Sequence, residues 1–232
     1  MQVLGIIPAR CGSKRVKDKN IKLLNGRPLI EYTIDAAKQS QGLDRFIVST
    51  DCSQIADVCK KAGAEVPFLR PAEIANDIAA DKAYLLHALD FLKNNEGYNP
   101  DAVMILRPTS PFKTAEIIDN VINLLKKTKA DSVRTMTLSE GVFHPYWMYK
   151  KMNGDRAIPF SEEAASGKFY QSQLLPEVYR LNGVVDIISV ETLRSSENMY
   201  GDDMRILELA EEFSLDIDTE FDFKIAELLM AE

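Results

Sequence analysis

Histidine and cysteine are scarce in this chain of 232 residues, which has two histidines and three cysteines. The cysteines form no C-x-x-C pair, and their odd number without a secretion signal predicts reduced thiols. With so few sulfur and imidazole ligands, a zinc site is not expected. Cys11 has no histidine near it in sequence, so we interpret it as a small residue in a tight loop rather than as a nucleophile.

Long apolar runs are also missing. The chain contains no run of 18 apolar residues, so no transmembrane helix is expected. Met1 leads directly into strand-like sequence, and the charges follow the apolar residues rather than precede them, which is unlike a secretory signal. We therefore expect a cytoplasmic protein. Its net charge of -7 argues against general binding to nucleic acid or to an anionic membrane.

Against this acidic background, one segment is strongly basic. Residues 10–27 contain seven basic side chains and one acid, and they follow a short apolar run at 3–7. The Walker and dinucleotide-binding glycine patterns are both absent. A solvated basic loop is one interpretation. Because the segment follows a first strand, at the sheet edge where α/β proteins bind ligands, we favour a polyphosphate site. The residues expected to contact phosphate are Arg10, Gly12, Ser13, Lys14 and Lys19.

Apolar runs alternate with helical periodicity through the first half of the chain. This alternation predicts an α/β fold, with a Rossmann-like, mostly parallel sheet flanked by helices. The length suits a single domain spanning 1–232. The expected strands are 3–7, 45–50, 65–69, 101–106 and 131–136, and the expected helices lie near 28–40, 53–62, 79–95 and 114–128.

The alternation breaks after Met136. Residues 137–180 are rich in aromatic side chains and turn formers, and Asn153-Gly154 predicts a hairpin. This excursion is interpreted as an interface, a substrate lid or a local core under a long loop. Because exposed aromatic side chains are costly in water, we expect a homodimer. Beyond it we expect a strand at 184–190, a helix or strand at 204–211, a short strand at 215–218 and a helix at 220–230.

Two aspartates near the C-terminus form a D-x-D pattern. On a strand, Asp216 and Asp218 would project to the same side. Adjacent carboxylates repel each other unless they share a cation, and Mg²⁺ is the natural one beside phosphate. The alternative is a helix cap, with Asp218 or Thr219 at the start of the final helix. Both roles are compatible if Thr219 makes the cap.

Three further loops follow expected strands. Arg107 opens an Arg-Pro-Thr-Ser-Pro turn, whose two prolines make it rigid. Arg70 and Asp77 lie in a second loop, and Asn182 precedes a strand. Each of these is also typical of an ordinary connecting turn, and for Asn182 alone the turn is the better interpretation.

Taken together, these blocks resemble the acylneuraminate cytidylyltransferases, also called CMP-sialic acid synthetases. The resemblance covers nearly the whole chain, with the blocks in the family's order. The blocks are 6–15, 19–20, 25–29, 48–51, 69–73, 107–111, 179–183 and 216–220.

The resemblance implies transfer of CMP from CTP to the anomeric hydroxyl of a nonulosonic acid, sialic or legionaminic, with Mg²⁺ as cofactor and a nucleotide-diphospho-sugar transferase-like fold. It implies that 137–180 is a dimerisation arm reaching the neighbouring site. The nucleotide-binding residues would be Ala9, Arg10, Gly12, Ser13, Lys14, Lys19, Asn20, Arg70, Asp77 and Arg107. The sugar-binding residues would be Gln173, Arg180, Asn182 and Asp186. The catalytic residues would be Arg10, Lys14, Lys19 and the metal-binding Asp216 and Asp218.

The chain departs from the family pattern mainly on the expected sugar side. Arg107 stands where the family has glutamine, and Asp186 stands where a tyrosine is expected. Asp186 either faces solvent, or lines the site and pairs with a base such as Arg180 or Arg107. Two alternatives stay open: transfer to another acidic sugar such as 3-deoxy-manno-octulosonate, or a catalytically silent nucleotide-binding homologue.

Overall fold

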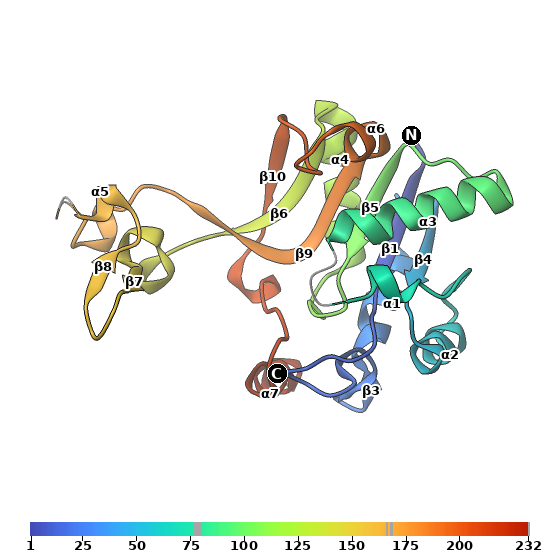
Figure 1. The fold of residues 1–232 in the computed structure, drawn as a ribbon, viewed down its shortest axis with the longest axis horizontal. Helices are drawn as coiled ribbons and strands as arrows, with labels where there is room; N and C mark the ends of the chain where they lie inside the picture. Colours follow the sequence, from blue (N-terminus) through green and yellow to red (C-terminus); the bar gives the residue numbers. More distant parts are fainter. Residues whose placement is uncertain (77–79, 166, 168, 232) are drawn as a thin grey trace.

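The computed structural model describes residues 1–76, 80–165, 167 and 169–231, and its centre is a six-stranded sheet (Figure 1). The strand order is β10-β6-β9-β5-β1-β4, and every neighbouring pair is parallel except those that β9 makes with β5 and β6. The prediction of a mostly parallel α/β sheet is confirmed. The strands are β1 (Val3–Pro8), β4 (Arg45–Ser49), β5 (Ala102–Leu106), β6 (Ser132–Leu138), β9 (Tyr179–Ser189) and β10 (Met204–Glu208).

Helices cover both faces of the sheet, which explains why β1 and β5 are apolar along their whole length. All five residues of β5 are buried. One core cluster joins the sheet to α1, α2 and α4, and a second joins the opposite face to α3 and α6. The helices are α1 (Leu29–Gln39), α2 (Ser53–Lys61), α3 (Asp81–Glu96), α4 (Ala115–Thr128) and α6 (Val190–Ser195). α3 thus begins at Asp81 rather than near 79, which lies outside the described residues.

A third, smaller core ties the N-terminal basic loop to the C-terminus. It contains Val16 and Leu24 from the N-terminal region, and Ile217 and Phe223 from the C-terminal region. Thr219 caps α7 (Glu220–Met230) in a capping box with Asp222, so the capping role is confirmed for Thr219. This core includes the short β2 (Leu23–Leu24), which pairs with β3 (Arg27–Pro28) after the 3₁₀ turn η1 (Lys19–Ile21).

Two of the expected strands are not formed as predicted. The segment 65–69 makes only isolated bridges, Ile47 with Glu65 and Thr50 with Leu69. The prediction of a strand at 215–218 is wrong, because this segment pairs with no strand. Its anchor is the Ile217 amide, which donates to the Thr109 carbonyl (2.8 Å). The ambiguous segment at 204–211 contains β10, a strand.

β6 and β9 continue beyond the sheet into an arm that protrudes from the rest of the molecule (Figure 1). The arm has its own small core, in which Trp147 donates to the Phe169 carbonyl (2.6 Å) and the rings of Tyr146 and Phe169 lie 4.7 Å apart. Other aromatic side chains are exposed, including Phe143 (62%) and Tyr170 (84%). Its elements are η3 (Gly141–Phe143), η4 (Pro145–Trp147), β7 (Tyr149–Lys151), β8 (Ala157–Pro159), α5 (Glu162–Ala165) and η5 (Ser172–Leu174).

The arm therefore has local packing of its own, one of the three interpretations, and an exposed apolar surface; the interface and the lid stay predictions. The hairpin expected at Asn153-Gly154 is confirmed by the pairing of β7 with β8.

Elsewhere, η2 (Ala72–Ile74) and η6 (Glu211–Phe213) are short 3₁₀ turns. Among the helices of the described residues, none combines the length and the apolar character that a membrane span requires.

Candidate active site

A cleft of about 520 Å³ lies where β1 and β5 end, and it is lined by side chains from distant parts of the sequence. The basic loop forms one side, and residues that follow β4 and β5 form the other. The position matches the rule that open α/β sheets bind ligands at the carboxyl ends of their strands. Eight of the predicted site residues line the cleft: Arg10, Ser13, Lys14, Lys19, Asn20, Arg70, Arg107 and Asp218.

The basic side of the cleft is held against the sheet by backbone contacts. The Ala9 amide donates to the Ser49 carbonyl (3.0 Å), and the Cys11 amide donates to the Asp51 carboxylate (2.8 Å). Gly12 has a φ of +70°, and nothing lies within 4 Å of where its Cβ would be. Asn20 is buried and donates to the Arg10 carbonyl (3.3 Å). The loop is therefore folded before any ligand binds.

Of the two aspartates near the C-terminus, Asp218 lines the cleft, and Asp216 is not among the lining residues. Lys19 donates to the Asp218 carboxylate (2.9 Å) and to the Ile217 carbonyl (2.8 Å), and Arg15 donates to the other oxygen of Asp218 (3.2 Å). The pKa of Asp216 is raised, chiefly by desolvation; the Thr109 hydrogen bond lowers it and the charge of Asp218 raises it. The two carboxylates are thus close enough to repel each other, although the segment is not a strand.

The opposite side of the cleft contains two arginines that have different partners. Arg70 is buried, donates to the hydroxyl (3.0 Å) and carbonyl (2.6 Å) of Ser49, and lies 4.5 Å from the Tyr84 ring centre. Arg107 donates to Asp81 (2.6 Å) and to Asp186 (2.8 Å). On this side Arg107 is paired with two carboxylates, whereas Arg70 hydrogen bonds neutral groups of Ser49 and lies against an aromatic ring.

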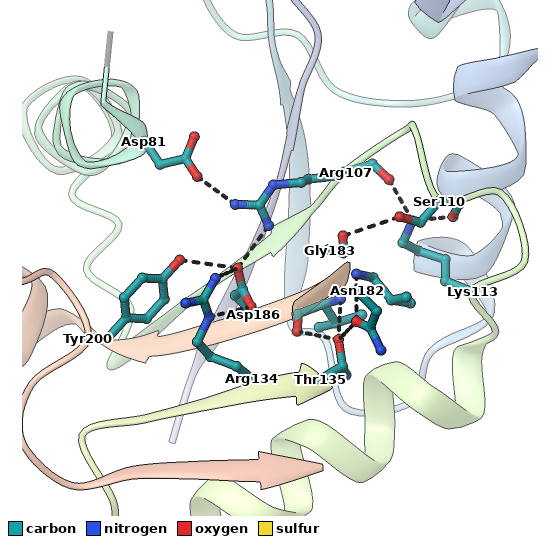
Figure 2. Close-up of polar contacts among 12 residues, drawn as sticks. Asp81, Arg107, Ser110, Lys113, Arg134, Thr135, Asn182, Gly183, Asp186 and Tyr200 are labelled. Carbon is teal, nitrogen blue, oxygen red and sulfur yellow. Dashed lines mark hydrogen bonds and ion pairs between the residues drawn. The ribbon is translucent and has the colours of Figure 1, made fainter. Parts of the chain in front are cut away.

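Asp186 is the centre of a buried charge network (Figure 2). Its side chain is 2% exposed, and it accepts from Arg107, from Arg134 (3.0 Å) and from the Tyr200 hydroxyl (3.2 Å). Burial by itself would raise the pKa of Asp186, but the two guanidinium groups outweigh it and hold the pKa below its ordinary value. Of the two alternatives for Asp186, the solvent-facing one is wrong: Asp186 pairs with Arg107, although it is not among the residues that line the cleft.

Other predicted residues do not line the cleft of their own chain. Asn182 is buried, and its amide is engaged by the hydroxyls of Thr135 (2.7 Å) and Thr137 (3.0 Å) on β6. Arg180 binds the Glu211 carboxylate and the Ser214 hydroxyl (3.0 Å). Gln173 is exposed on the arm. Asp77 lies outside the described residues, and the sugar-binding roles stay predictions.

Sequence reasoning missed several residues around the cleft. Asp81 and Tyr84 line it from the first turn of α3, where helical periodicity gives no hint of a ligand. Of these residues, Arg134 had the clearest signal in the sequence, because it interrupts an expected buried strand just as Asp186 interrupts another. Opposite charges in two apolar strands of one sheet indicate a buried pair, since each alone would be costly.

The fold and the cleft define a Rossmann-like α/β protein whose cleft has a preformed basic side. The chain belongs to the cytidylyltransferase family, whose profile matches residues 4–226. It is 34% identical to CMP-N,N'-diacetyllegionaminic acid synthase of Legionella pneumophila, over 99% of this chain and 97% of that protein. It is 30% identical to N-acylneuraminate cytidylyltransferase of Escherichia coli over 97% of this chain, which spans about half (51%) of that longer protein.

Solved structures with the same fold share much less sequence. A CMP:2-keto-3-deoxy-manno-octonic acid synthetase, solved as a complex with CTP, superposes with a TM-score of 0.73 at 16% identity, over 100% of this chain and 99% of that one. A 4-diphosphocytidyl-2C-methyl-D-erythritol synthase of Anaerococcus prevotii gives 0.65 at 15% identity, with the same coverage. These likenesses establish the fold.

The Asp186 network makes a testable contribution to stability. We expect Asp186→Asn to lower the free energy of unfolding at pH 7 by about 3–5 kcal/mol, because Arg107 and Arg134, both partly buried, lose the carboxylate between them. Since the pKa of Asp186 is depressed, its stabilising effect should disappear as the pH falls below about 4, and the two proteins should then converge. Chemical denaturation across pH measures both effects.

The matched control is Asp90→Asn, which removes a solvent-exposed pair with Arg194 and should cost less than about 1 kcal/mol. Equal losses for the two variants, or a loss for Asp186→Asn that does not change with pH, would show that the buried network does not stabilise the fold.

Proposed function

We propose that this protein transfers CMP from CTP to the anomeric hydroxyl of a nonulosonic acid and releases pyrophosphate. The observation that carries the proposal is the cleft itself: a basic loop and an aspartate face a side that contains Tyr84 and Arg107, which is paired with two carboxylates. A triphosphate suits the first side and a neutral base suits the second. Relatives named for legionaminic and N-acylneuraminic acid support the choice of acceptor.

In the proposed reaction the anomeric oxygen attacks the α-phosphorus of CTP and forms a new P–O bond. The bond between the α-phosphorus and the bridging oxygen breaks, pyrophosphate leaves with that electron pair, and the hydroxyl proton passes to water. Arg10, Lys14 and Lys19 stabilise the negative charge that develops on the leaving group. Because the basic loop is tied to the sheet beforehand, little reorganisation is needed when CTP binds.

Asp216 and Asp218 fit the needs of a magnesium site. Two carboxylates suffice for Mg²⁺ when phosphate oxygens and water complete its shell, and the described residues offer no cluster of three or more metal-binding side chains. When bound, Mg²⁺ would neutralise phosphate charge and favour ionisation of the attacking hydroxyl. Lys19 and Arg15 bind Asp218 here, so a triphosphate would draw these cations away and free the carboxylate.

The binding site for the acceptor sugar would be completed by a second subunit. Gln173 lies on the protruding arm, and the exposed aromatic side chains of this arm favour a homodimer. In that dimer the arm of one subunit reaches the cleft of its partner. Transfer to 3-deoxy-manno-octulosonate is the second candidate, favoured only by the shared fold, and a silent homologue is disfavoured by the intact basic loop and aspartates.

The acceptor is tested by pyrophosphate release with CTP across a panel of acidic sugars. We expect turnover with a nonulosonic acid, legionaminic or sialic, and little with 3-deoxy-manno-octulosonate. CTP should be preferred over ATP, since the side of the cleft that contains Arg107 and Tyr84 would contact the neutral base itself. Turnover with no sugar in the panel would contradict the proposal, and a preference for the eight-carbon sugar would support the second candidate.

The metal role is tested by Asp218→Ala. We expect kcat to fall at least about 100-fold, the scale for losing one key electrostatic group, with a weaker dependence on Mg²⁺. The matched control is Glu220→Gln, since Glu220 is a nearby exposed acid that pairs with Lys22. Steady-state kinetics over a Mg²⁺ titration measure the effect. Wild-type kinetics in Asp218→Ala would remove this aspartate from the metal site.

The shared site is tested by mixing two inactive variants, Asp218→Ala in the cleft and Gln173→Ala on the arm. If the arm acts on the partner's cleft, random mixed dimers should recover about a quarter of the wild-type activity. Sedimentation should give a dimer at micromolar concentration. A fully active monomer, or mixtures as inactive as their components, would exclude a site shared between subunits.

A further inference from the structure

Lys113 is a buried lysine that the proposed reaction does not use. It is 4% exposed and lies just before Thr114, the residue that caps α4. Its ammonium group donates to the carbonyls of Arg107 (2.6 Å) and Ser110 (2.6 Å), and to the Thr33 hydroxyl (3.3 Å) (Figure 2). An ammonium group has three N–H donors, so these contacts use all of them.

This placement is costly. Among the described residues, no carboxylate lies within ion-pair distance of the Lys113 ammonium group. Burial, and to a lesser degree the charge of Arg107, lowers the pKa of Lys113 to about 7. An apolar side chain of similar length would fill the same space without this desolvation cost. The compensating feature is the pair of inward-facing carbonyls at 107 and 110, which would otherwise lack a strong donor.

The turn that Lys113 holds connects both sides of the cleft. At its start, the Arg107 side chain binds Asp81 and Asp186. Two residues later, the Thr109 carbonyl accepts from the Ile217 amide, and Thr109 hydrogen bonds the Asp216 carboxylate. Because 215–218 pairs with no strand of the sheet, this turn is its principal anchor to the β5 end.

We propose that Lys113 is a positioning residue that fixes the 107–110 turn, and so sets the spacing between Arg107 and the Asp216–Asp218 pair. This role rests on the proposed function of the cleft. Lys113 itself is not among the residues that line the cleft, so it acts through the turn rather than on substrate. Displacements of about 1 Å in a reacting site can cost 100-fold in rate, which makes a rigid turn valuable.

The test compares Lys113→Met with wild type by amide hydrogen exchange and by kinetics. Methionine keeps a similar length but removes every donor. We expect the Ile217 amide to exchange about five- to tenfold faster, because its acceptor at Thr109 is no longer held, while amides of β1 and β5 stay protected. We also expect kcat to fall about 10- to 100-fold with little change in the KM for CTP.

The matched control is Lys38→Met, which removes an exposed lysine that donates to the Ala62 carbonyl, and it should alter neither readout. Lys113→Gln keeps two donors and should be intermediate in both; it replaces Lys113→Met if that variant does not fold. Unchanged exchange at Ile217 in a folded Lys113 variant would overturn the proposal. Exchange is measured without substrate, so it tests Lys113 even if the sugar panel shows no turnover.

Discussion

The architecture around the cleft depends on one buried carboxylate between two guanidinium groups. β9 runs antiparallel between β5 and β6, which places Asp186 in register with Ile105 on one side and Arg134 on the other. From there Asp186 reaches Arg107 at the end of β5. Arg107 also binds Asp81, so the network contains two carboxylates and two guanidinium groups. A buried network is stable only when every member is satisfied, so the cleft inherits its rigidity from this balance.

This balance also divides the cleft by charge. On one side, Arg10, Lys14, Arg15 and Lys19 come from a loop held by backbone contacts to the sheet. On the other, Arg107 is paired with the carboxylates of Asp81 and Asp186, and Arg70 donates to neutral groups of Ser49. A ligand that carries several negative charges at one end and a neutral aromatic ring at the other fits this division. β6 and β9, which carry Arg134 and Asp186, extend into the arm, so the site and the proposed subunit contact share one framework.

Much of the fold was predictable because it depends on local signals. Apolar runs, helix caps such as Thr114, and the turn at Asn153-Gly154 predicted most elements correctly. The errors fell where a segment forms no continuous strand: 65–69 makes only isolated bridges, and 215–218 pairs with no strand. Alternating burial alone does not reveal whether a strand partner exists. The pairing of Asp186 was likewise left open, since its environment depends on neighbours more than 50 residues away.

The sequence by itself determined the class of fold, the basic loop and the residues grouped as a cytidylyltransferase site, because motif order and local periodicity are properties of the chain. Tertiary structure alone decided which of those residues meet. It brought Asp218 to Lys19, buried Asp186 under Arg107, and left Gln173 on the arm. It also revealed Lys113 beneath the turn at 107–110. The physical reason is that burial and charge pairing are set by long-range contacts, and these exist only once the sheet has assembled.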